Sequence, residues 1–189
     1  MLPDNVKKFI HHEKNIIFYE ELPIPDVTVN SISICRELCK ENKCGSYGKS
    51  GTCPPAVGTI EECIDKVNKY KHAAILIQTI ENIDVKDKEQ TFHRTSIFQN
   101  TCRMIMHMLK DEKYEVLALT CGPCTYCEVC SNPKGKTCKY PELQVPSMSG
   151  FGIIIKEYVG KIGLDFSFCD DKITLYGILL YSNDEKTSL

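Results

Sequence analysis

Residues 121–130 read Cys121-Gly122-Pro123-Cys124-Thr125-Tyr126-Cys127-Glu128-Val129-Cys130. A cysteine therefore recurs at every third position, and a further one follows in the segment Cys138-Lys139-Tyr140-Pro141. Thiols this close cannot all form disulfides, because each disulfide needs its own Cα separation and torsion angle. The spacing instead suits an inorganic centre, and repeated C-x2-C steps with a later cysteine near a proline are typical of 4Fe–4S clusters. Zinc also binds C-x2-C pairs, so it is the alternative.

The composition is that of a single globular domain spanning residues 1–189, with 42% hydrophobic and 25% charged residues. A net charge of −2 gives no reason to expect nucleic acid or an anionic membrane as partner. The chain shows neither a charged-then-apolar leader nor an apolar run of the ~20 residues that a membrane span needs, so we expect a cytoplasmic protein. Its 12 cysteines are unusual, and in a reducing cytosol clustered cysteines indicate metal or redox chemistry.

Hydrophobic periodicity predicts alternating helices and strands. We expect helices over residues 3–13, 29–40, 60–67, 89–110 and 150–160, and strands over residues 16–19, 73–80, 116–119 and 173–181. Ser149 is the expected N-cap of the last helix. This interleaving predicts an α/β or α+β fold: one domain, with a sheet of about four or more strands flanked by helices. Two cysteine-rich loops would then bind metal.

The other cysteine-rich loop, which comes first along the chain and is called the first loop, contains Cys39, Cys44 and Cys53. Three thiols in a turn-rich segment favour a further metal site, either with an open position or with a fourth ligand. Cys35 lies one helical turn before Cys39 and could supply that ligand, as could Cys121.

Three cysteines fall outside both loops. Cys63 and Cys102 lie on the apolar stripes of their predicted helices, so we interpret them as core residues. Cys169 has no partner nearby in the sequence and stays unassigned. Lys134, Lys136 and Lys139 surround Cys138, either as a solvated loop or as charge compensation for an anionic centre.

Taken together, these motifs carry a family resemblance. The loop that ends in Cys53-Pro54-Pro55, the Gly122-Pro123-Cys124 loop and the segment Pro146-Ser147-Met148 resemble a prokaryotic family of predicted metal-binding proteins of unknown function. The resemblance covers about residues 30–181. It implies that seven cysteines are the ligands of the family: Cys39, Cys44, Cys53, Cys124, Cys127, Cys130 and Cys138. The chain departs from the pattern at Ser149, where an acidic residue is usual.

Three functional hypotheses follow. The first is an iron–sulfur protein with one 4Fe–4S cluster, or two, that transfers electrons or performs redox or Lewis-acid chemistry on a small substrate. It would need a redox partner protein or a small-molecule substrate. The second is a zinc-stapled binding module without catalysis. The third is a thiol redox enzyme that uses cysteine pairs between Cys121 and Cys130.

Overall fold

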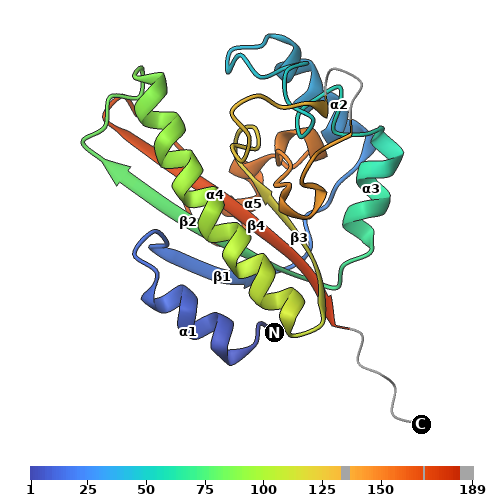
Figure 1. Ribbon diagram of the computed structural model, residues 1–189, viewed down its shortest axis with the longest axis vertical. Helices are drawn as coiled ribbons and strands as arrows, with labels where there is room; N and C mark the ends of the chain where they lie inside the picture. Colours follow the sequence, from blue (N-terminus) through green and yellow to red (C-terminus); the bar gives the residue numbers. More distant parts are fainter. Residues whose placement is uncertain (133–136, 168, 184–189) are drawn as a thin grey trace.

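The computed structural model describes residues 1–132, 137–167 and 169–183 (Figure 1). In these residues the helices are α1 (Asp4–His12), α2 (Val29–Lys40), α3 (Ile60–Asn68), α4 (Lys88–Asp111) and α5 (Ile155–Gly160). The 3₁₀ turns are η2 (Pro141–Leu143) and η3 (Ser149–Phe151). The strands are β1 (Phe18–Leu22), β2 (His72–Glu81), β3 (Tyr114–Thr120) and β4 (Lys172–Asn183). Apart from the helix predicted over residues 150–160, each expected element is confirmed with small shifts at its ends.

The four strands form one sheet in the order β1-β2-β4-β3, and every neighbouring pair is antiparallel. The fold is therefore α+β, because an α/β fold would need parallel strands. The central pair, β2 and β4, joins residues far apart in sequence, from His72 opposite Tyr181 to Glu81 opposite Lys172.

Helices cover both faces of this sheet. On β2, Ala73, Ile75 and Ile77 pack into one hydrophobic cluster, while Ala74 and Leu76 pack into the other. The first cluster lies against α2, α3, η3 and α5, and the second against α1 and α4. Burial on both faces explains why β2 and β4 read as almost continuous apolar runs rather than as alternating patterns.

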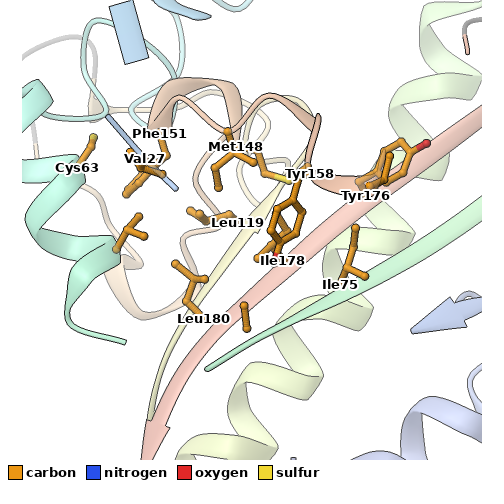
Figure 2. Close-up of a cluster of buried hydrophobic side chains, with 14 of the residues drawn as sticks. Val27, Cys63, Ile75, Leu119, Met148, Phe151, Tyr158, Tyr176, Ile178 and Leu180 are labelled. Atoms are coloured by element: carbon orange, nitrogen blue, oxygen red, sulfur yellow. The ribbon is translucent and has the colours of Figure 1, made fainter. Parts of the chain in front are cut away.

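Figure 2 shows part of the first cluster, where Phe151 and Met148 pack near Leu119 of β3. Cys63 belongs to this cluster and Cys102 to the other, and both side chains are fully buried. Their predicted role in core packing is confirmed. No helix in the described ranges combines the length and apolar character needed to cross a membrane.

The predicted helix over residues 150–160 is wrong in its first half. Residues 149–151 form η3, Gly152 adopts a left-handed conformation with φ of 74°, and α5 begins only at Ile155. Ser149 therefore does not cap α5, whose N-cap is Ile154 without a side-chain hydrogen bond. Glycine is required at this turn, because a Cβ on residue 152 would collide with the backbone of Ile32 in α2.

We expect Gly152→Ala to destabilise the fold by more than about 2 kcal/mol. A Cβ at Gly152 would lie 2.6 Å from the Ile32 amide nitrogen, and this contact adds to the strain of a positive φ. Gly163→Ala is the matched control, because Gly163 has a φ of 73° but an added Cβ there would meet no atom within 4 Å. Urea unfolding of both variants separates the two causes; equal losses would show that the contact with α2 contributes nothing.

Candidate metal centre

The loop after β3 brings four predicted ligands to one place. Cys124, Cys127, Cys130 and Cys138, here named the Cys124 cluster, all line one small cavity of about 20 Å³. Burial raises the pKa of the Cys127 thiol, and the neighbouring Cys124, Cys138 and Cys130 raise it further, while Lys139 lowers it. The four thiols therefore lie close enough to interact electrostatically.

Whether these residues fit a metal depends on their donors and their geometry. As the side chains stand, no group of three or more Cys, His, Asp or Glu within the described ranges is placed to hold a metal ion. The donor set nevertheless fits a soft metal, because four thiols suit zinc and iron–sulfur centres equally.

A buried arginine contacts this cluster from α4. The Arg103 side chain donates from Nη2 to Cys124 Sγ at 3.2 Å and from Nε to the Leu143 carbonyl at 2.9 Å. Its guanidinium also lies over the Tyr126 ring, 5.3 Å from the centroid. Arg103 is only 4% exposed, and no carboxylate of the described residues forms an ion pair with it. The guanidinium is instead satisfied by hydrogen bonds to the Leu143 carbonyl, the Asn100 side chain and the Cys124 sulfur.

Two further buried side chains fix the backbone of the same loop. The Gln99 amide of α4 donates to the Pro123 carbonyl at 2.8 Å, and its oxygen accepts from the Thr125 N–H at 2.9 Å. The Thr52 hydroxyl accepts from the Cys124 N–H at 2.9 Å. The Gly51 N–H donates to Cys130 Sγ at 3.3 Å. Such N–H donors to sulfur stabilise thiolates, so both α4 and the first cysteine loop support the Cys124 cluster.

The Pro-Ser-Met segment joins the two loops. Ser147 forms a parallel bridge with Thr120 at the end of β3, and its N–H donates to the Thr52 carbonyl at 3.0 Å. The Met148 N–H donates to the Thr120 carbonyl at 2.9 Å. The segment thus holds the end of β3 and the first loop in fixed positions, next to the first residues of the Cys124 cluster.

The first loop gathers the other three predicted ligands. Cys39 lies at the end of α2, Cys44 is exposed and Cys53 is buried; these three are named the Cys39 cluster. Burial raises the pKa of Cys53 to about 12, with smaller contributions from Cys44 and Cys39. Burial also raises the pKa of Cys39, and Cys44 raises it further. These mutual effects place the three thiols near one another.

The remaining cysteines belong to neither cluster. Cys35 is buried in α2. Burial raises the pKa of its thiol, and the nearby Cys39 raises it further. Cys121 is directed to the sheet, where its sulfur accepts from the Tyr176 N–H at 3.4 Å. Cys169, which was unassigned, lines the same cavity as Cys121. Lys134 and Lys136 lie outside the described residues.

Reasoning from the sequence missed Arg103, Gln99 and Thr52. A signal was present for two of them: Gln99 and Arg103 are four residues apart, each next to a residue of the apolar stripe of α4. Polar side chains at the border of a buried stripe must find partners, and here the partner is the cysteine loop. Thr52 carries no comparable local signal.

Comparison with known proteins supports a metal-binding role. A family model described as "Predicted metal-binding protein (DUF2284)" matches residues 22–181, which is most of the chain. No curated protein and no solved structure matches the sequence. The chain belongs to the DUF2284 family of predicted metal-binding proteins.

Proposed function

We propose that this chain is an iron–sulfur protein whose Cys124 cluster binds a 4Fe–4S centre. The observation that carries the proposal is the combination of four thiols around one cavity with a buried guanidinium directed at Cys124. A 4Fe–4S centre supplies one-electron redox chemistry, and its thiolate-ligated core is anionic. Arg103 and the Gly51 N–H would stabilise that negative charge and tune the reduction potential.

The ligand spacing favours iron–sulfur over zinc. Three cysteines at successive C-x2-C steps, followed by Cys138 two residues before Tyr140-Pro141, resemble ferredoxin-type ligand sets. Structural zinc sites more often use two separated C-x2-C pairs. One observation favours a zinc-stapled, non-catalytic module instead: a cavity of about 20 Å³ has room for an ion, whereas a four-iron core would require the loop to spread.

The Cys39 cluster would hold a second centre. Three thiols with Cys35 buried close by leave its fourth position either open or supplied by that residue. An open position would allow a metal to act as a Lewis acid on a small substrate, whereas a complete set would favour electron transfer to a partner protein. We infer that the protein performs either function in the cytoplasm.

The test is metal analysis of anaerobically purified protein. The proposal predicts brown protein with iron and acid-labile sulfide in equal amounts, and an electron paramagnetic resonance signal after reduction. Stoichiometric zinc without iron or sulfide would support the zinc-stapled module. Colourless protein that keeps its fold after chelation would contradict both, because a structural metal contributes directly to folding.

A further inference from the structure

A sizeable cavity lies outside both cysteine clusters, and no cysteine of either cluster lines it. It has a volume of about 530 Å³ and lies between the face of β4, the Pro-Ser-Met segment and the residues Phe166, Ser167, Cys169 and Asp170. Its apolar wall includes Met148, Ile153, Phe166 and Tyr176. Cavities of this size with mainly apolar walls are typical of small-molecule sites.

A second hollow of about 230 Å³ adjoins it. The two share Ser167, Lys172, Thr174 and Tyr176, so they meet along one face of β4. Alternate residues of a strand point to the same face, which explains why Lys172, Thr174 and Tyr176 stand in a row. Figure 2 shows the Tyr176 hydroxyl directed away from the apolar cluster. The shared floor therefore carries an ammonium and two hydroxyl groups beside apolar walls.

The charged side chains around this floor differ in how far they are buried. Lys172 is half-buried, while three nearby carboxylates are exposed: Asp170 at the same cavity, Asp165 at the adjoining hollow and Glu81 opposite Lys172 on β2. No ion pair of the described residues includes Lys172. Exposed carboxylates are screened by water, so the ammonium has the stronger effect on a ligand inside the cavity.

We propose that this cavity binds a small organic acid with an apolar, aromatic body. The acid group meets Lys172 and the Thr174 hydroxyl, and the body packs against Met148, Ile153 and the Phe166–Tyr176 ring pair, whose centroids lie 5.9 Å apart. The cavity also reaches Gly122, two residues before Cys124, and a Cβ at Gly122 would meet no atom within 4 Å. The acid would thus lie beside the loop that carries the Cys124 cluster.

Two matched fluorescent probes test this proposal on the full chain. 8-Anilinonaphthalene-1-sulfonate has an aromatic body with an anionic group, and N-phenyl-1-naphthylamine has the same body without the anion. We expect the wild type to bind both. Lys172→Met should weaken binding of the sulfonate roughly tenfold and leave binding of the neutral probe within about twofold, because only the charge-assisted contact is lost. Lys156→Met, at an exposed position of α5 that lines neither hollow, should change neither.

A second variant tests the location by size. Ser149 lines the cavity at an exposed position, so Ser149→Trp should weaken binding of both probes. The proposal is overturned if the wild type binds neither probe, if Lys172→Met and Lys156→Met act alike, or if Ser149→Trp leaves both affinities intact. None of these readouts depends on a metal, so an iron-free protein would contradict the proposed function and leave this inference standing.

Discussion

Replacing Arg103 with Met is expected to lower the free energy of unfolding by about 3 kcal/mol and to weaken metal binding at the Cys124 cluster by at least about tenfold. At this chain length such a loss corresponds to a decrease in melting temperature of roughly 6–12 °C. The two effects have separate causes, and both arise from contacts of one buried side chain.

The stability effect comes from acceptors that lose their donor. Arg103 donates to the Leu143 carbonyl at 2.9 Å, to Gln99 Oε1 at 3.3 Å and to Cys124 Sγ at 3.2 Å. Met fills the volume of the aliphatic stem but donates no hydrogen bond. The Leu143 carbonyl and the Cys124 sulfur therefore lose a donor, while Gln99 Oε1 keeps the Thr125 N–H. The metal effect comes from the lost positive charge beside the Cys124 sulfur. Arg103→Lys keeps the charge without the planar fork, so it should recover metal affinity better than stability.

Urea unfolding of the metal-free chain and chelator competition on the metal-loaded chain measure the two effects separately. Arg94→Met is the matched control, because Arg94 lies on the same helix with an exposed side chain. It should change neither measurement. If Arg103→Met unfolds at the same urea concentration as the wild type and keeps its metal in the presence of the chelator, this arginine does not support the cluster.

The sequence predicted the elements of the fold well because their signals are local. For example, the Thr59 and Glu62 side chains, three positions apart in the sequence, form a capping box that marks the start of α3. The order of the strands could not be predicted in the same way. It depends on the pairing of β2 with β4, whose residues His72 and Tyr181 are far apart in the chain, and no local pattern encodes such a contact.

Gly152 shows the limit of periodicity most directly. Apolar residues continue past this position, but Gly152 adopts a left-handed conformation that ends η3, and Ile32 of α2 leaves no room for a Cβ there. In the candidate site, too, local patterns and tertiary contacts must be distinguished. Spacing alone predicted which cysteines would lie together, whereas the polar side chains that support them come from α4 and from the opposite loop. Tertiary packing, rather than local sequence, brings Arg103 to Cys124.

Cys127→Ala should lower the melting temperature far more than Cys53→Ala, by about 10 °C relative to the wild type. Cys127 lies in the middle of the Cys124 cluster, in a segment between β3 and η2 that has no α-helix or strand in its described residues. Its contacts with Gln99, Thr52, Arg103 and Gly51 reach Cys130 but none of them involves Cys127, so the order around Cys127 should depend on the metal. Losing one central ligand should therefore release the metal and the loop together.

Cys53→Ala should remove the metal of the Cys39 cluster while the core survives. The Cys53 side chain is buried, but backbone hydrogen bonds hold the loop in place without its thiol. The Gly48 N–H donates to the Pro54 carbonyl at 3.0 Å, and the Val57 N–H donates to the Cys53 carbonyl at 3.1 Å. Neither bond involves sulfur, and Pro54 and Pro55 restrict φ on their own.

Anaerobic metal content and thermal melting of both variants measure this difference, with Cys169→Ala as the control for losing a half-buried thiol outside the two clusters. Cys169→Ala should keep its full metal content and melt within a few degrees of the wild type. The division into two centres is wrong if Cys53→Ala melts as low as Cys127→Ala or keeps all of its metal. In the first case both loops would depend on one shared centre. The hydrogen bond from the Gly51 N–H to Cys130 Sγ already joins the two loops at that place.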